Sequence, residues 1–462
     1  MALRADDQRQ LIALVGEAFA RTAPDDRLRY GTDALQMGHP ADLVLLPGTA
    51  GEVAAIARHC HHRRIPLVVR GAGTGYTGGA VPVRGGVVIS MERFTRILEI
   101  DEVNLLAVVE PNVITGDLQR AVEARGLFYP PDPASLGQSA IGGNVAECAG
   151  GPRAVKYGTT RRYVLALEAV LPTGELVRTG SKAVKNVVGY DLTQLLVGSE
   201  GTLAIITRIT LRLVPKPPVQ ATVRATFGSV AAAVGGVTAL LAARVVPATI
   251  ELVDRTSIQA VERHLGRAVA PGDTGAMLLI DVDGTPAAVD DELARVETAC
   301  RAAGATDIRR AADEDERARL WEARRALSLA LRALAPRKIN HDLVVPRGRV
   351  PELLDLVARV ADRHGLLIPC FGHAGDGNIH VNIMVDPADG GAMARAALAE
   401  RELFEGTIAL EGSISGEHGI GFAKAKYLGL ELTPETVALM RRVKAAFDPH
   451  GVLNPGKIFA GE

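Results

Sequence analysis

The sequence predicts an α+β protein built from two domains with additional segments at both ends. Glycine-rich loops separate short, β-branched stretches in the first half of the chain. The stiff run Pro215–Pro218 then interrupts the pattern, and after it strands alternate with long helices. We therefore expect an N-terminal helical segment over residues 1–38, a first domain over 39–217, a second domain over 218–425 and a C-terminal helical segment over 426–462.

The first half of the chain carries the signals of short strands. Residues 1–38 are expected to be helical because apolar side chains recur at helical spacing there. Pro66–Val69 and Val87–Ser90 are predicted strands on either side of a glycine-rich loop, and Ile205–Val214 alternates as a half-buried strand does.

The second half alternates between strand and helix, which predicts an antiparallel sheet with helices on one face. From Leu366 onward we expect strands, glycine loops and one last helix. The predicted strands are Thr222–Phe227, Thr249–Val253 and Met277–Val282, and the predicted helices are Val230–Ala243, Pro286–Ala303, Asp313–Leu334 and Pro434–Phe447.

Composition and charge exclude several classes of function. The chain is 47% hydrophobic and 23% charged with a formal net charge of −1, so no basic field recruits nucleic acid or an anionic membrane. Its apolar stretches are too short to span a bilayer. The four cysteines are scattered without a CxxC pair, which excludes an iron–sulfur cluster or a Cys₄ zinc site within the chain and favours a cytoplasmic protein with reduced thiols.

The glycine loop between the first two predicted strands indicates an anion site. Gly73, Gly75 and Gly78 match GxGxxG, but a strand follows where a Rossmann site would have a helix. We expect a loop whose backbone amides wrap a diphosphate, and the alternative is a flexible turn. Two further glycine clusters, Ser135–Gly151 and Val197–Thr202, bring the total to the number that an extended cofactor such as FAD could use.

A second motif, GHAGDGNIHVN, indicates metal chemistry. Its Gly-Asp-Gly turn brings His373 back toward the strand that carries His380 and Asn382 on one face. With Glu417 from the loop SGEHGIG, the two imidazoles form a His₂Glu set, typical of a catalytic zinc site with an open position. Manganese and cobalt are alternatives. Taken alone, these residues fit hydrogen-bonded turn positions better than a metal site.

The motifs RGAGTGYTGGAVP, DPASLGQSAIGGNVAECAGG, VGSEGTLAIIT, FGHAGDGNIHVNI, SGEHGIG and FDPHGVLNPGKIF occur in this order over nearly the whole chain. Together they resemble FAD-binding flavoproteins of the vanillyl-alcohol oxidase type. More narrowly, they resemble the D-2-hydroxy-acid dehydrogenase branch, with D-lactate dehydrogenases, the flavin subunit of glycolate oxidase and D-2-hydroxyglutarate dehydrogenase. The resemblance implies a two-part FAD-binding domain, an α+β substrate (cap) domain with an antiparallel sheet, and a C-terminal segment that returns to the flavin.

The resemblance also implies which residues bind the cofactor. Tyr76 stands in the first loop where some relatives carry a histidine that tethers the flavin, so we expect non-covalent FAD. The residues implied to bind FAD are Arg70, Gly71, Ala72, Gly73, Thr74, Gly75, Thr77, Gly78, Pro133, Ser135, Gly137, Gly143, Asn144, Gly150, Ile206 and Asn454.

The resemblance assigns His373, His380 and Glu417 as ligands of a divalent metal, most simply Zn²⁺. A neighbouring imidazole, His418, is poised to take the substrate hydroxyl proton near neutral pH.

Two helical residues complete the predicted substrate site. Arg324 and Ser328, four apart on one helix, are expected to hold the substrate carboxylate together with Asn382. The alternatives are the neighbouring Arg325 or a solvated Arg324. In relatives that use a dicarboxylic substrate, a lysine aligns with Asn340, which favours a smaller acid here.

The predicted function is therefore FAD-dependent oxidation of a D-2-hydroxy acid of the D-lactate or glycolate type, with electrons passed to an external acceptor. The acceptor would be an iron–sulfur subunit, a quinone, a cytochrome or an electron-transfer flavoprotein. We expect a homodimer without direct membrane insertion, with attachment to the inner membrane through a partner as an alternative. The alternatives in function are a D-2-hydroxyglutarate dehydrogenase, the flavin subunit of a multi-subunit glycolate oxidase, an oxidase that uses oxygen, a zinc hydrolase, or a non-catalytic FAD-binding subunit.

Overall fold

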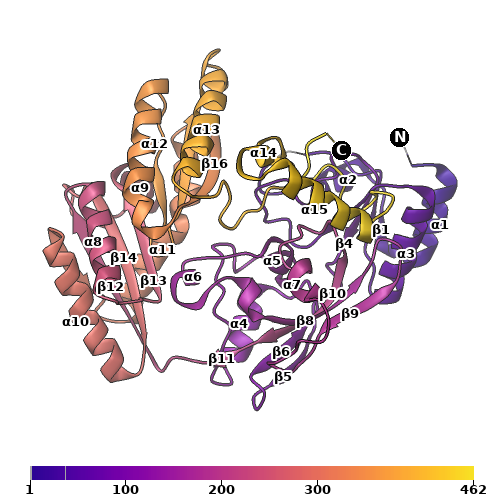
Figure 1. Ribbon diagram of the computed structural model, residues 1–462, viewed down its shortest axis with the longest axis horizontal. Coiled ribbons are helices and arrows are strands. Elements are labelled where there is room, and N and C mark those ends of the chain that lie inside the picture. Colours follow the sequence, from indigo (N-terminus) through magenta and orange to yellow (C-terminus); the bar gives the residue numbers. More distant parts are fainter. Residues whose placement is uncertain (1–2, 37, 462) are drawn as a thin grey trace. The chain divides into compact units, whose positions relative to one another are not determined.

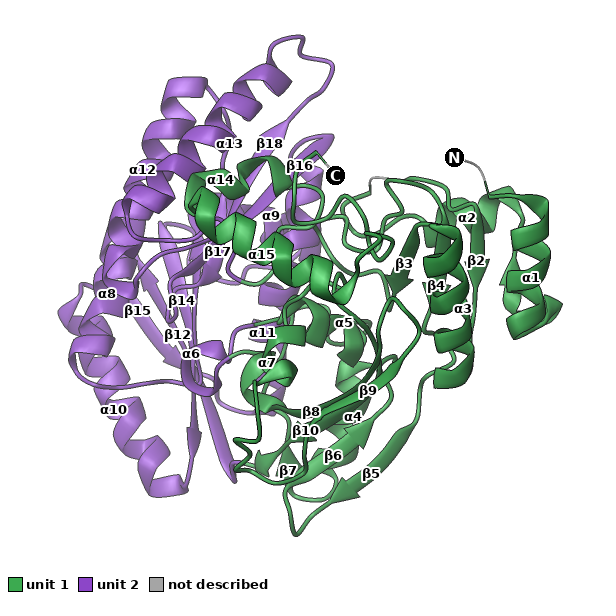
Figure 2. Cartoon of the chain, turned by 45° about the vertical axis from the view of Figure 1, so that its right-hand side comes forward, with its two compact units in different colours: residues 1–150, 159–216, 417–462 green, residues 151–158, 217–416 purple. Residues whose placement is uncertain are grey.

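The computed structural model describes residues 3–36 and 38–461. The predicted terminal segments include positions 1, 2, 37 and 462, which lie outside the described residues. The chain divides into two compact units (Figure 2). Unit 1 comprises residues 1–150, 159–216 and 417–462, and unit 2 comprises residues 151–158 and 217–416.

A four-stranded sheet of order β1-β2-β4-β3 forms the first part of unit 1, and its strands β1 and β4 are labelled in Figure 1. Both β2 and β3 run parallel to β4, while β1 runs antiparallel to β2. Helices α1 and α3 pack on this sheet through Leu11 and Ile56, which are fully buried in the same core as Leu43 and Ile89. The bounds are α1 Ala5–Val15, β1 Ala20–Arg21, α2 Pro24–Tyr30, β2 Leu43–Leu45, α3 Ala50–Arg63, β3 Leu67–Arg70 and β4 Val87–Ser90.

A five-stranded antiparallel sheet of order β5-β6-β10-β8-β9 forms the second part of unit 1. Its central strand, β10 (Ile205–Arg212), lies where a strand was predicted, but it exposes only Arg208 and Arg212 and is otherwise buried on both faces, so the predicted half-buried alternation is wrong. The other strands are β5 Ile97–Asp101, β6 Leu106–Val109, β8 Val164–Val170 and β9 Leu176–Gly180, and β7 Leu127–Phe128 pairs with β11 Val214–Pro215. The remaining helices of unit 1 are α4 Thr115–Glu123, α5 Ile141–Glu147, α7 Leu192–Leu196, α14 Leu428–Glu431 and α15 Pro434–Phe447.

Helix α5 forms part of the second glycine cluster, Ser135–Gly151, where no helix was predicted. Ile141 and Val145, four positions apart, are both fully buried, and this apolar pair gives the segment a helical face despite its glycines.

Unit 2 is built on a seven-stranded antiparallel sheet of order β15-β12-β14-β13-β17-β18-β16. This confirms the predicted antiparallel sheet. The strands are β12 Val219–Phe227, β13 Thr249–Asp254, β14 Ala276–Gly284, β15 Asp307–Arg310, β16 Arg337–Val344, β17 Cys370–His373 and β18 Asn378–Val385. The helices are α6 Ala154–Tyr157, α8 Val230–Ala242, α9 Arg255–Leu265, α10 Pro286–Ala302, α11 Glu314–Ala330, α12 Val350–His364 and α13 Ala392–Ala409. Residues 151–158 belong to this unit, where Lys156 and Tyr157 both bond Asp283 of β14.

The sequence predicted helices on one face of the sheet of unit 2, but the structure has helices on both faces. Helices α9 and α11 share a core with Met277, whereas Gly236 of α8 lies against Leu278. Consecutive residues of a strand point to opposite faces, so helices cover both sides. The buried central strands need this cover, because nearly every residue of β14 is buried.

Helix α13 lies where strands and loops were expected. Its buried face includes the small residues Ala392, Ala396 and Ala399, and it packs against α12. Alanines carry a weak apolar signal, so the helical period did not stand out in the sequence.

Two histidines of α3 pack inside unit 1, since His59 is half-buried and His61 is buried. His59 bonds Asp7 at 3.1 Å, and the ring of His61 stacks on His450 with centroids 4.2 Å apart.

Candidate active site

A tight hairpin between β17 and β18 positions the two histidines. The carbonyl of His373 accepts hydrogen bonds from the amides of Asp376 and Gly377, at 3.2 and 3.1 Å. Gly377 has φ +90°, and a Cβ there would lie 2.0 Å from the carbonyl oxygen of Val345, so only glycine fits. The turn therefore returns the chain directly, and His373 pairs with Asn378 at the start of β18.

Strand register gathers the polar side chains of unit 2 on one face of the sheet. Glu251 of β13 lies opposite His373 of β17, and His380 of β18 lies opposite Asp342 of β16. His380 also pairs with Phe371, two residues before His373 on the same strand. Because directly opposite residues point to the same face, these side chains converge although they come from four strands.

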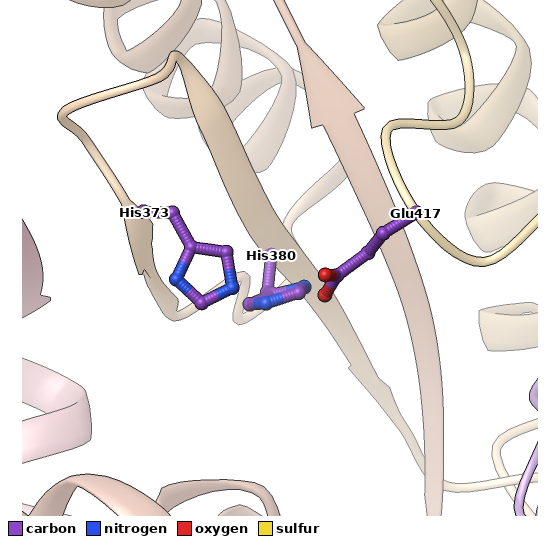
Figure 3. Close-up of side chains that lie close together, drawn as sticks. All are labelled: His373, His380 and Glu417. Atoms are coloured by element: carbon purple, nitrogen blue, oxygen red, sulfur yellow. The ribbon is translucent and has the colours of Figure 1, made fainter. Parts of the chain in front are cut away.

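His373, His380 and Glu417 form a candidate metal site (Figure 3). Each offers a ligand atom, and these atoms all lie within 4.8 Å of one another. The two imidazoles are buried and meet edge to face with ring centroids 5.1 Å apart. Two imidazoles and one carboxylate suit Zn²⁺ or another divalent first-row metal, so the donor set fits the group that the motifs imply.

Glu417 is held close to this face by its chain neighbour. The backbone amide of Gly416 donates to the carbonyl of Asp342 at 3.0 Å, and a Cβ on Gly416 would lie 2.3 Å from the side-chain nitrogen Nδ2 of Asn378. Glycine at position 416 therefore lets the loop press against the strands. Glu417 is the next residue, which places its carboxylate beside the histidines.

A fully buried carboxylate lies behind His373. Oε1 of Glu251 is 2.6 Å from Nδ1 of His373, and Oε2 of Glu251 accepts a hydrogen bond from Nε of Arg324 on α11. Burial alone would raise the pKa of Glu251, but the charges of Arg324 and His373 outweigh it and lower that pKa to about 2. The carboxylate is therefore ionised and its charge is balanced inside the protein.

The other predicted substrate residues lie on the same side of the sheet. Asn382 is completely buried, and its side chain bonds Asn340 at 2.8 Å and the carbonyl of Pro369 at 3.2 Å. The hydroxyl of Ser328 accepts a hydrogen bond from Nζ of Lys338 at 2.6 Å. Arg324 is buried rather than solvated. The roles of these residues toward a substrate stay predictions, and the structure adds that their polar atoms already have protein partners.

The glycine clusters of unit 1 meet in space. A Cβ on Gly71 would contact Ala140 at 3.4 Å and the amide of Gly143 at 3.9 Å, which joins the first cluster to the second. By contrast, a Cβ on Gly75, Gly137 or Gly143 would meet nothing within 4 Å. These bare positions leave room for a ligand against the backbone, as an FAD cradle requires.

Two side chains stabilise the first glycine loop from behind. Asp33 accepts a hydrogen bond from the amide of Gly78 at 3.0 Å, and Arg70 donates to the carbonyl of Thr32 at 2.6 Å. The loop lies between β3 and β4, and residues 71–86 contain no helix, as predicted. Neither Asp33 nor its role was predicted.

Glu200 connects the third glycine cluster, Val197–Thr202, to two motifs near the C-terminus, SGEHGIG and FDPHGVLNPGKIF. This buried residue accepts hydrogen bonds from the amides of Ile420 and Gly421, which follow His418 after one intervening glycine. Its carbonyl accepts from Nδ2 of Asn454 at 2.8 Å, while the buried Oδ1 of Asn454 has no partner among the described residues. An oriented but unused acceptor at this position fits a bound cofactor.

Glu417 and His418 lie beside predicted flavin residues of unit 1. A Cβ on Gly150 would lie 2.8 Å from Oε2 of Glu417. The backbone carbonyl of His418 accepts a hydrogen bond from Oγ1 of Thr77 at 3.1 Å, and the ring centroids of His418 and Tyr76 are 5.3 Å apart. The same loop therefore carries the predicted metal ligand and the predicted base past the glycine clusters.

The remaining residues implied to bind FAD all occur on these segments. Ala72 and Thr74 belong to the first loop, Pro133 and Ser135 form a turn closed by Leu136 and Gln138, Asn144 is buried in α5, and Ile206 is buried in β10. Their contacts with a cofactor stay predictions.

Comparison with known proteins decides the family. Residues 41–180 match the FAD binding domain family, and residues 216–458 match the C-terminal domain of FAD linked oxidases. The chain belongs to the FAD-linked oxidases. It is an FAD oxidoreductase, which confirms the resemblance found in the motifs.

Individual relatives agree with this family. The chain is 42% identical to glycolate oxidase subunit GlcD of Bacillus subtilis (strain 168) over 98% of this chain and 97% of the relative. It is 36% identical to a D-lactate dehydrogenase of Anaerostipes hadrus, over 90% of this chain and 89% of the relative. A substrate-bound structure of p-cresol methylhydroxylase has 18% identity and a TM-score of 0.82, covering 98% of this chain and 96% of that one, which confirms the vanillyl-alcohol oxidase type of fold.

Among the helices that the structure describes, none combines the length and apolar character that crossing a membrane requires.

Proposed function

We propose that the protein oxidises a D-2-hydroxy acid of the D-lactate or glycolate type to the 2-oxo acid, with non-covalent FAD and a divalent metal, most simply Zn²⁺. The observation that carries the proposal is the His373, His380 and Glu417 set in an FAD-linked oxidase. Relatives named glycolate oxidase subunit and D-lactate dehydrogenase over nearly their whole length support the substrate class.

Different residues of the chain would have different roles in this reaction. When bound, FAD would supply the hydride acceptor, and the metal a Lewis acid for the hydroxyl and carboxylate oxygens of the acid. His418 would take the hydroxyl proton on its imidazole, because a histidine side chain can act as a general base at neutral pH. Arg324 and Ser328 would orient the substrate carboxylate, and Asn382 would support them from the strand that carries His380.

One specific observation favours a second candidate, the flavin subunit of a multi-subunit glycolate oxidase. The first relative above is described as a subunit and matches the chain almost end to end. A D-2-hydroxyglutarate dehydrogenase is less well supported. The motif resemblance implies a lysine in such relatives where this chain has Asn340, and Asn340 donates its side-chain amide to Asn382.

The test is anaerobic reduction of the flavin in the purified protein. D-lactate, L-lactate, glycolate and D-2-hydroxyglutarate are added separately, and bleaching of the flavin absorbance is followed. The proposal expects bleaching by D-lactate or glycolate and none by L-lactate. Bleaching by D-2-hydroxyglutarate alone would contradict the proposed substrate, and a protein that binds no FAD would contradict the reaction itself.

Two finer points belong to the same proposal. Electrons would leave for an external acceptor, because the four cysteines form no cluster-binding motif. The protein would be a homodimer in isolation. Turnover with a soluble dye as electron acceptor tests the first point. Light scattering during gel filtration tests the second, where a monomer mass of 48.6 kDa would contradict it.

A further inference from the structure

Glu251 is a carboxylate that no sequence motif assigned, yet it touches the candidate metal site. It is fully buried in the central strand β13, and its neighbours Ile250 and Leu252 are fully buried apolar residues. A buried carboxylate in such a strand is costly unless it is paired and hydrogen-bonded. Both of its oxygens are engaged, one by His373 and the other by Arg324.

The contact with His373 determines which ring nitrogen faces the other ligands. Oε1 of Glu251 is an acceptor, so the imidazole nitrogen 2.6 Å from it, Nδ1, carries the proton. The opposite nitrogen, Nε2, is then the atom that can coordinate an ion. A carboxylate on the second nitrogen of a ligating histidine fixes the tautomer and the ring orientation, and raises the basicity of the ligand.

Strand register and Arg324 keep this carboxylate in place. Glu251 and His373 are direct partners in the β13–β17 ladder, so their separation is set by the backbone. The guanidinium of Arg324 lies over the ring of Phe371, 4.8 Å from its centroid, and balances the charge of Glu251. The arrangement is rigid because strand pairing, a buried ion pair and an aromatic ring all hold it.

We propose that Glu251 is the positioning residue of the metal site, holding His373 with Nε2 toward the ion and Arg324 in its place on the same side of the sheet. The inference rests on the metal site of the proposed function. It adds that one buried carboxylate joins a metal ligand to the arginine proposed to hold the substrate carboxylate. Removing its charge therefore weakens metal binding first and substrate binding with it.

The test measures divalent-metal affinity rather than activity alone. Metal-stripped, FAD-containing protein is titrated with Zn²⁺, and separately with Mn²⁺, against a competing chelator. Glu251→Gln keeps the shape of the side chain and removes its charge, and we expect the metal affinity to fall about 10- to 100-fold with the flavin spectrum unchanged. KM for the acid should rise with metal saturating, since Arg324 loses its partner.

A matched control separates this effect from a general loss of a buried carboxylate. Asp281 of β14 is also buried in the sheet, and it bonds Thr222 and Trp321 instead of a metal ligand. Asp281→Asn should lower the melting temperature and leave the metal affinity as it is. If Glu251 served packing alone, Glu251→Gln would behave as Asp281→Asn does.

The outcomes are distinct. Unchanged metal affinity in folded Glu251→Gln would overturn the role of Glu251 while the metal site stands. A wild-type protein that binds neither metal would remove the site itself. Should Glu251→Gln fail to fold, the tautomer of His373 can be measured instead. Two-bond ¹H–¹⁵N spectra of metal-free wild-type protein with ¹⁵N-labelled histidine report it. We expect the Nδ1–H tautomer for His373, assigned with His373→Gln, and the Nε2–H tautomer would overturn the proposal.

Discussion

Adding one methyl group at Gly143 tests where the flavin binds. Gly143 lies inside α5 and is not in the left-handed region, and a Cβ there would meet nothing within 4 Å. The protein without cofactor should therefore accept Gly143→Ala without strain. Alanine in a helix is better than glycine by roughly 0.5–1 kcal/mol, so the apoprotein should become slightly more stable.

The same methyl group should weaken FAD binding, because it occupies the space proposed for the cofactor. Overpacking a close-fitting contact costs about 1–3 kcal/mol. Every 1.4 kcal/mol is tenfold in affinity, so the Kd for FAD should rise about 5- to 150-fold. Stability and cofactor affinity are thus expected to move in opposite directions.

The assay is titration of apoprotein with FAD, followed by quenching of flavin fluorescence, with thermal unfolding of the apoprotein measured in parallel. Gly235→Ala in α8 is the matched control, since a Cβ at that helical glycine also meets nothing within 4 Å. It should raise stability and leave the Kd unchanged. An unchanged Kd for Gly143→Ala would refute the placement of FAD against α5.

Further outcomes follow from the site. His380→Ala should abolish metal binding and turnover while FAD stays bound, as measured by metal analysis and absorbance; undiminished activity after chelation would contradict the metal role. His418→Ala should slow flavin reduction in stopped flow by about two to four orders of magnitude, whereas an effect confined to KM would make His418 a binding residue. Burial lowers the pKa of Lys338 to about 8, below its unfolded value of about 10.4, so the unfolded chain binds more protons in that range. The free energy of unfolding should therefore rise between pH 8 and about pH 10.4, by up to about 3 kcal/mol from this group. Lys338→Met should remove that rise in denaturant titrations, and an identical pH dependence in the variant would refute the shift.

The sequence predicts elements best where one signal dominates. Helix α15 has the predicted bounds because Pro434 marks its first turn and Thr433 caps it. Strand β4 lies where the β-branched run predicts it. Helix α13 was missed because much of its buried face consists of alanines, which give a weak periodic signal. Helix α12 carried a clear signal that was not used, since Leu353, Leu356, Val357 and Val360 recur at helical spacing.

For the candidate site too, the sequence predicted what local signals determine and missed what depends on tertiary structure. His373 and His380 belong to one hairpin, so their spacing and turn already predict that they meet. Glu417 carried a weaker signal, a carboxylate in a glycine-flanked loop, and no local pattern ties it to the hairpin, so the family resemblance was needed to assign it as a ligand. Glu251 carried one signal that was not used, a carboxylate between the apolar residues Ile250 and Leu252 of a strand, which a fold can bury only with partners. Those partners depend on strand order, which the sequence alone does not reveal.

The most direct test of the account is the metal dependence of flavin reduction. The acid that bleaches the wild-type flavin fastest under anaerobic conditions is mixed with holoprotein, with metal-stripped protein, and with stripped protein resupplied with Zn²⁺ or Mn²⁺. We expect FAD to stay bound throughout, flavin reduction to be lost when the metal is removed, and Zn²⁺ or Mn²⁺ to restore the reduction. Equally fast reduction in protein shown to be metal-free would contradict the claim that His373, His380 and Glu417 hold a metal needed for the reaction.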